Sequence, residues 1–369
     1  MKTEVIIIDP NNIENEKDKL SYAAAIIKNG GLVAFPTETV YGLGANAMDR
    51  EAVKNIFKAK GRPSDNPLIV HISSKYSIDN LVTGVPSWAQ KLVDNFWPGP
   101  LTLIFKKTPS VPDEITAGLE TLAIRMPAHP VALSLIDESG LPIVAPSANK
   151  SGKPSPTTAA HVFEDLAGKI DLIIDGGPTR VGIESTVLDI TSYPPVVLRP
   201  GGITLEQLRD VLGEVRQYIE DYAEDGKNPG YAKGKDKNNC AGNCGEIPRS
   251  PGLKYKHYSP AAKIITVEGE LEKVINKINE LVVRYEEKQV RVGVLATNQT
   301  KDLYKASTVI SMGDRNHPDT IASNLFNCFR EFDNFNMQVV LAESIDKTGI
   351  GLAVMNRLIK ASGYNIIRV

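Results

Sequence analysis

The chain has 369 residues, with 42 lysines and arginines against 44 aspartates and glutamates, which gives a formal net charge of −2. This length exceeds a typical domain of about 100–200 residues and predicts two domains, and the near-neutral charge argues against a surface coated for nucleic-acid binding. An apolar share of 42% and a charged share of 23% are ordinary for a soluble globular protein, so global disorder and a fibrous repeat are excluded.

The cysteines and the N-terminal segment favour the cytoplasm. The opening MKTEVIIIDP has too short an apolar run for a signal peptide, and no run approaches the roughly 18 apolar residues of a membrane span. Three cysteines cannot form a disulfide framework in so long a chain. Cys240, Cys244 and His257 could be imagined as zinc ligands, but their spacing is not a standard zinc pattern, and we interpret them as ordinary loop residues.

The first half of the chain alternates helices with short buried strands. Apolar residues recur at helical spacing over 19–28, and LVAFPT then predicts a strand. Asp49 is expected to cap a helix whose Val53, Ile56 and Phe57 share one face. Further apolar runs predict strands at 68–72, 101–105, 122–125, 143–145, 172–174, 187–190 and 196–198. This order predicts an α/β domain with one large, twisted, mixed sheet.

The composition changes between residues 221 and 260 to glycine, lysine, asparagine, aspartate and proline, as is typical of a linker. Beyond it, strands at 264–267, 290–295 and 339–341 alternate with helices that end near 287, 332 and 361. We therefore predict an N-terminal α/β domain at 1–210, a linker at 211–261 and a smaller, Rossmann-like α/β domain at 262–369. Within the linker, SPGLKYKHYSP (250–260) is aromatic and basic, which suits a lid over a site.

Several polar segments follow predicted strands. PTETVYGLGANA (36–47) combines hydroxyls with glycines in a predicted loop, which taken alone fits an ordinary turn as well as a ligand-binding loop. Neither GxxxxGK[ST] nor GxGxxG occurs, so a nucleotide would be held differently. Lys60 and Arg62 follow a helix whose C-terminal end would repel phosphate, so these cations themselves would attract anions. Arg125 interrupts an apolar strand and needs an anionic partner, which a ligand carboxylate could supply.

Other residues are ambiguous when taken one at a time. His71 lies in a strand and fits either a core histidine or a site, and Ser185 and Arg199, at strand ends, are as readily structural. Arg357 and Lys360 in the last helix are interpreted as a solvated face rather than a site.

Six motifs in order, PTETVYGLG, KGRPSDNPL, RMP, PSANKSG, ESTVLD and RPG, resemble the YrdC family of threonylcarbamoyl-AMP synthases over roughly residues 20–205. The linker SPGLKYKHYSP and the C-terminal AESIDKTGIGLAVMNRLIKAS resemble the long, two-domain form of that enzyme. The stretch 224–246 looks like an insertion, and nothing in it suggests a function.

The resemblance implies roles for individual residues. Lys60 and Arg62 would be catalytic, and Arg125 would take the carboxylate of threonine. The residues that it implies around threonine are Thr37, His71, Arg125, Ala145 and Ser185. Those that it implies around ATP are Lys60, Ser64, Thr121, Ser147, Asn149, Ser155, Arg199, Tyr255 and Tyr258.

The reaction that the resemblance implies converts ATP, L-threonine and bicarbonate into L-threonylcarbamoyladenylate and pyrophosphate. Mg²⁺ would arrive with ATP, and a tRNA threonylcarbamoyltransferase complex would consume the product. A carbamate oxygen is already anionic and needs no side-chain nucleophile, which agrees with a chain that has no convincing catalytic triad.

Two alternatives are weighed against the synthase. One is a non-catalytic RNA-binding module, which the net charge disfavours, although weak RNA binding stays open. The other is carbamoyl transfer from carbamoyl phosphate, as in hydrogenase-maturation relatives, but the acylphosphatase and zinc-finger regions expected for that reaction are missing from the sequence.

Overall fold

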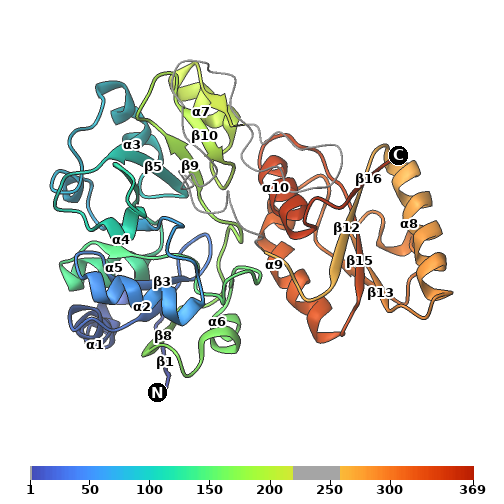
Figure 1. The fold of residues 1–369 in the computed structure, drawn as a ribbon, viewed down its shortest axis with the longest axis horizontal. Helices are drawn as coiled ribbons and strands as arrows, with labels where there is room; N and C mark the ends of the chain where they lie inside the picture. The colour runs from blue at the N-terminus through green and yellow to red at the C-terminus, as the bar shows by residue number, and fades with distance from the viewer. Residues whose placement is uncertain (1, 219–257) are drawn as a thin grey trace.

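The computed structural model describes residues 2–218 and 258–369, which form two α/β domains, each built on its own sheet (Figure 1). Four features of the sequence lie outside the described residues: the group Cys240, Cys244 and His257, the 224–246 insertion, Tyr255 and most of the predicted lid. No helix of the described residues is long and apolar enough to cross a membrane.

The first sheet is mixed and has eleven strands in the order β1-β8-β2-β3-β7-β4-β6-β5-β9-β10-β11. Its strands are β1 (Glu4–Ile7), β2 (Val33–Phe35), β3 (Gly42–Asn46), β4 (Ile69–His71), β5 (Leu101–Lys106), β6 (Thr121–Arg125), β7 (Ile143–Val144), β8 (Leu172–Asp175), β9 (Thr186–Asp189), β10 (Val196–Arg199) and β11 (Arg216–Gln217). The large mixed sheet predicted from the sequence is therefore confirmed.

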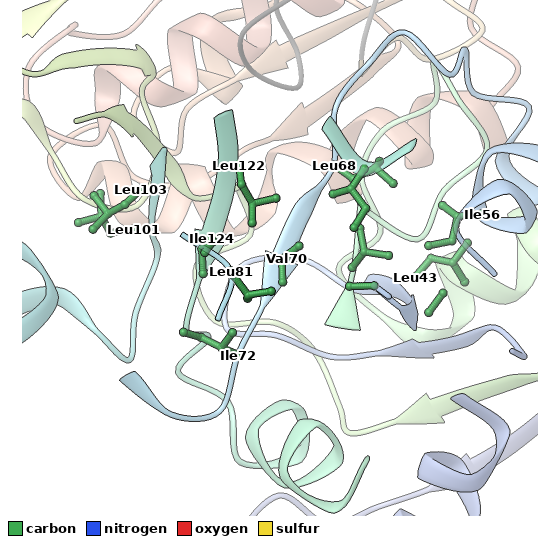
Figure 2. Packing of buried hydrophobic residues seen from close by; sticks show 14 of the residues in the cluster. Leu43, Ile56, Leu68, Val70, Ile72, Leu81, Leu101, Leu103, Leu122 and Ile124 are labelled. Atoms are coloured by element: carbon green, nitrogen blue, oxygen red, sulfur yellow. The ribbon is translucent and has the colours of Figure 1, made fainter. Parts of the chain in front are cut away.

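Helices cover both faces of this sheet, because successive strand residues point to opposite sides. The helices are α1 (Lys17–Lys28), α2 (Arg50–Lys60), α3 (Gln90–Phe96), α4 (Asp113–Thr116), α5 (Pro130–Ser139), α6 (Ala159–Leu166) and α7 (Leu205–Leu212). On β2, Ala34 joins the core cluster that includes Ile56 of α2, whereas Phe35 joins the cluster under α1 and α5. Figure 2 shows the first of these clusters, with Leu43 on β3, Val70 on β4 and Ile124 on β6.

The helix α2 shows how local signals position a ligand loop. The Asp49 side chain accepts hydrogen bonds from the backbone N–H groups of Glu51 and Ala52, as the sequence predicts for an N-cap. At the other end Gly61 adopts φ 61°, a left-handed conformation that favours glycine, and stops the helix directly after Lys60.

One strand beside the site, β3, was not predicted from the sequence. Residues 36–47 are predicted to be one loop, but their second half is β3, which pairs antiparallel with β2. The glycines that suggest a loop serve packing instead: a Cβ on Gly44 would lie 2.7 Å from the Phe35 ring.

The second sheet has five parallel strands in the order β14-β13-β15-β12-β16. Its elements are β12 (Lys263–Glu268), α8 (Leu271–Glu286), β13 (Val292–Ala296), β14 (Thr308–Ser311), α9 (Pro318–Asn334), β15 (Val339–Glu343), α10 (Gly351–Ala361) and β16 (Ile366–Arg368). A second, smaller α/β domain is thus confirmed.

The two domains share a core cluster. Helix α8 lies on the far face of the second sheet, whereas α9 and α10 lie between that sheet and the first domain (Figure 1). Val40 and Ile183 of the first domain pack into the cluster formed by α9 and α10. At Gly182 (φ 77°) a Cβ would lie 2.4 Å from the Cα of Ser323 in α9, so only glycine permits this close approach.

Candidate active site

One pocket lies where strand-end loops of the first sheet meet Tyr258, and its geometry starts with the loop after β2. The Thr37 hydroxyl donates to the Val40 carbonyl oxygen at 2.7 Å and accepts from the backbone N–H groups of Thr39 and Val40. These local bonds hold residues 37–40 as a compact turn whose backbone is fixed without a ligand.

Arg125, at the end of β6, is buried and pairs with Glu38, with Nη2 and Oε2 2.7 Å apart. Its Nη1 donates to the Thr39 hydroxyl at 2.8 Å, and its Nε donates to the Gly99 carbonyl oxygen at 3.2 Å. The guanidinium is therefore neutralised and oriented from behind while it lines the pocket.

His71 pairs with Arg125 in register across β4 and β6. Burial, and after it the charge of Arg125, lower the pKa of His71 from 6.5 to about 3, although the hydrogen bond to the Ile69 carbonyl oxygen acts in the opposite direction. The imidazole is thus neutral at physiological pH and can offer a hydrogen bond but no charge.

Lys60 connects two motifs that are distant in the sequence. Its ammonium donates to the carbonyl oxygens of Ser147 and Asn149, at 2.5 Å in the second case, and the Ser147 hydroxyl donates to the Asn149 side chain at 2.6 Å. Burial lowers the pKa of Lys60 well below its ordinary value, and the nearby Arg62 lowers it further. An anion in the pocket would favour the charged form of this lysine.

The opposite wall comes from the loop before β9 and the end of β10. Arg199 donates from Nε and Nη2 to the Ser185 carbonyl oxygen at 3.2 and 3.0 Å, and from Nη2 to the Ser185 hydroxyl at 3.2 Å. Glu184 accepts a 2.5 Å hydrogen bond from the Ser155 hydroxyl.

The pocket gathers most of the residues predicted from the sequence. Those that line it are Thr37, Lys60, Arg62, His71, Arg125, Ala145, Ser147, Asn149, Ser155, Ser185, Arg199 and Tyr258. Two others do not: Ser64 is exposed in the loop after α2, and Thr121 is the first residue of β6, at the end opposite Arg125.

The interpretation of Arg357 and Lys360 as a solvated face is wrong, because both side chains are buried. Helix α10 has no broad solvent face, since it is enclosed between its own sheet and the first domain. The Arg357 Nε donates to Glu184 at 2.7 Å, so the second domain reaches the wall of the pocket.

The sequence analysis also overlooked Glu38, Thr39 and Glu184. A usable signal was present for Glu184, because a carboxylate that directly precedes an apolar strand calls for a cationic partner if it is buried. Among the residues that line the pocket, Glu184 is the one carboxylate, and the described part of the chain holds no cluster of three metal-ligating side chains.

Taken together, a pocket at strand ends of a mixed sheet, with five cationic side chains, one paired carboxylate and several hydroxyls, defines an α/β enzyme site for an anionic small molecule. The cations are Lys60, Arg62, Arg125, Lys153 and Arg199.

Comparison with known proteins identifies the family. A family model described as telomere recombination matches residues 25–201, and one described as threonylcarbamoyl-AMP synthase, C-terminal domain, matches residues 203–363. The chain is 51% identical to the threonylcarbamoyl-AMP synthase of Pyrococcus abyssi, with 96% of this chain and 97% of the relative covered, and 47% identical to that of Bacillus subtilis, with both chains covered in full. A crystal structure of P. abyssi Sua5 complexed with L-threonine is 49% identical, with both chains covered in full and a TM-score of 0.87. The chain belongs to the threonylcarbamoyl-AMP synthase family, and it is an enzyme.

Proposed function

We propose that the enzyme uses ATP to convert L-threonine and bicarbonate into L-threonylcarbamoyladenylate, with release of pyrophosphate. The observation that carries this proposal is that Arg125 lies on the lining of the same pocket as Lys60, Arg62 and Arg199. One cation suits an amino-acid carboxylate and the others suit a polyphosphate.

The threonine end is supported by the surroundings of Arg125. Its guanidinium is held by Glu38, Thr39 and Gly99, so a substrate carboxylate would meet a pre-oriented donor. Neutral His71 next to it would accept or donate a hydrogen bond without attracting a second anion. The relative solved with L-threonine is in agreement with an amino-acid site in this fold.

The phosphate end is supported by the buried cations. Lys60 is held by the loop of Ser147 and Asn149, and Arg199 by Ser185, so both side chains are in position before ATP arrives. Preorganised charges in a site that excludes water stabilise the charge that develops during phosphoryl transfer.

The chemistry then requires positioning rather than a side-chain nucleophile. The threonine amine attacks the bicarbonate carbon, and loss of water gives a carbamate. A carbamate oxygen then forms a bond to the α-phosphorus of ATP as the bond to pyrophosphate breaks. Because that oxygen is already anionic, little general-base assistance is needed.

We also propose that Mg²⁺ is carried in on the ATP phosphates, where it would help to neutralise their charge. The donor set of the pocket fits this role rather than a resident metal, since its one carboxylate, Glu184, is engaged by Ser155 and Arg357. We infer that the product passes to a tRNA threonylcarbamoyltransferase complex in the cytoplasm.

Pyrophosphate release tests the proposal. We expect release from ATP only when both L-threonine and bicarbonate are present, and we expect Lys60→Ala to abolish it because the fixed cation and its link to residues 147 and 149 are lost. Thermal denaturation of the variant separates lost chemistry from lost folding. Release without L-threonine, or normal turnover by a folded Lys60→Ala variant, would contradict the assignment.

A further inference from the structure

The side chain of Arg357 crosses from the second domain to the pocket wall and is fully buried. Its Nε donates to Glu184 at 2.7 Å, and its Nη1 donates to the Pro200 carbonyl oxygen and the Asn356 side chain, both at 2.9 Å. A guanidinium without solvent contact is stabilised only by such fixed partners, and two of these three belong to the first domain.

Glu184 transmits this contact to the pocket. One of its carboxylate oxygens accepts from Arg357, and the other accepts from the Ser155 hydroxyl at 2.5 Å. Both Glu184 and Ser155 line the pocket, whereas Arg357 stands behind them. The orientation of the Ser155 hydroxyl is therefore set by an arginine that does not itself face the ligand.

The charge of Glu184 affects how the pocket would bind a phosphate. Burial alone would raise the pKa of Glu184, but the charges of Arg357 and Arg199, with hydrogen bonds from Ser155 and Arg357, hold it below its ordinary value. The group is therefore an anion in a pocket suited to phosphates. Without Arg357 its charge would oppose the cations that attract ATP.

A second contact joins the same helix to the same pocket. The Tyr258 ring lines the pocket, stacks on Phe326 of α9 with centroids 5.2 Å apart, and lies 5.5 Å from the guanidinium carbon of Arg357. The next residue, Ser259, donates from its backbone N–H to the Gly152 carbonyl oxygen and from its hydroxyl to the Ala361 carbonyl oxygen. Helix α10 is thus tied to the pocket through Glu184 and through residues 258–259.

We propose that Arg357 is a positioning residue of the active site, through which the docked second domain neutralises Glu184 and orients Ser155 for ATP binding. This inference rests on the proposed function of the pocket, because it assigns the polyphosphate of ATP as the ligand that Glu184 would otherwise repel. It gives the second domain a direct part in the affinity of a pocket built almost wholly by the first.

The test is a double-mutant cycle with Arg357→Met, Glu184→Gln and the double variant. The Kd of each protein for ATP is measured by calorimetric titration in the presence of Mg²⁺. We expect Arg357→Met to raise the Kd for ATP by about 10- to 100-fold, because it leaves a buried carboxylate uncompensated. The Kd for L-threonine should stay within about threefold, since Arg125 and its partners are untouched. The double variant should return to the ATP affinity of Glu184→Gln alone.

Arg330→Met is the matched control. Arg330 is another buried arginine of the second domain that pairs with the first, through Asp165 at 2.9 Å. Asp165 does not line the pocket, and when Arg330 is lost it keeps Lys153 as a partner at 2.8 Å, so no uncompensated carboxylate is left beside the ligand. Its loss should lower thermal stability and leave the Kd for ATP within about threefold. If Arg357→Met does not fold, Arg357→Lys, which keeps the charge but loses the Pro200 contact, provides an intermediate Kd for the same comparison.

Two results would overturn the inference: an ATP affinity of Arg357→Met no weaker than that of Arg330→Met, or additive effects in the double variant. These outcomes are distinct from failure of the proposed function. That failure would appear as no threonine- and bicarbonate-dependent pyrophosphate release by the unchanged protein, whereas additivity in a protein that does release pyrophosphate rejects only the role of Arg357.

Discussion

Two buried arginine–glutamate pairs flank the pocket, and they face it in opposite ways. In the first pair Arg125 lines the pocket and Glu38 stands behind it; in the second Glu184 lines the pocket and Arg357 stands behind it. The first pair lies wholly within the N-terminal domain, and the second joins the two domains. The proposed threonine end is therefore built from the first domain alone, whereas the proposed phosphate end also depends on α10 of the second domain.

The largest effect is expected from breaking the internal pair. Arg125→Met should lower the free energy of unfolding by about 3–5 kcal/mol, because it strands the buried Glu38 carboxylate, and it should abolish L-threonine binding. Denaturant unfolding and calorimetric titration with L-threonine measure the two effects separately.

The double variant Arg125→Met/Glu38→Gln sharpens the contrast between the pairs. Removal of both charges should recover much of the stability, but L-threonine binding should stay absent because the pocket has lost its cation. In the Arg357 and Glu184 pair the corresponding double variant is expected to recover ligand affinity. Restored L-threonine binding in the Arg125 double variant would show that Arg125 serves the fold and not the substrate.

A smaller effect is expected from a substitution that disturbs the interface between the domains and leaves both pairs unchanged. In Gly182→Val the new side chain would meet the backbone of α9, since even a Cβ would lie 2.4 Å from the Cα of Ser323. We expect a loss of about 1–3 kcal/mol in unfolding free energy and weaker ATP binding, with L-threonine binding retained. Calorimetric titration with each ligand would measure this difference.

Gly140→Ala is the control for backbone strain alone. Gly140 also has a positive φ, 63°, but a Cβ there meets no atom within 4 Å. This variant should lose stability through its left-handed backbone while binding both ligands normally. If Gly182→Val behaved like Gly140→Ala, close docking of α9 would not matter for the phosphate end.

The two pairs also differ in how far their residues could be predicted from the sequence. Arg125 was recognisable because a charge inside an apolar strand demands a partner, and Lys60, Ser147 and Asn149 were recognisable because they lie in short motifs that resemble those of the family. Apolar periodicity likewise predicted α2 and its capping residue Asp49. These features depend on a few neighbouring residues.

The role of Arg357 depends instead on what covers its helix. In GLAVMNRLIKAS, Arg357 and Lys360 have the spacing of a hydrated stripe, and only the docking of α10 against the first domain removes the water. The glycines of β3 led to the wrong prediction of a loop for a related reason. Gly44 is required because the Phe35 ring of the neighbouring strand lies close to it, and this contact is not visible in the sequence. Both wrong predictions, for α10 and for β3, therefore arose from contacts between residues that are distant in the sequence or in different elements.

The smallest effect at neutral pH concerns His71, beside the internal pair, because it appears only on acidification. In the folded protein its pKa is lowered from 6.5 to about 3, mainly by burial and then by the charge of Arg125. Between these values the unfolded chain binds a proton that the folded chain does not, so stability should be full above pH 6.5 and fall by about 1.4 kcal/mol per pH unit below it. His71→Asn cannot titrate and should flatten the pH dependence of the free energy of unfolding by that amount, measured from pH 7 to 4.5. Parallel curves for the two proteins would mean that His71 titrates alike in both states, and the neutral imidazole assigned to the threonine end would have to be abandoned.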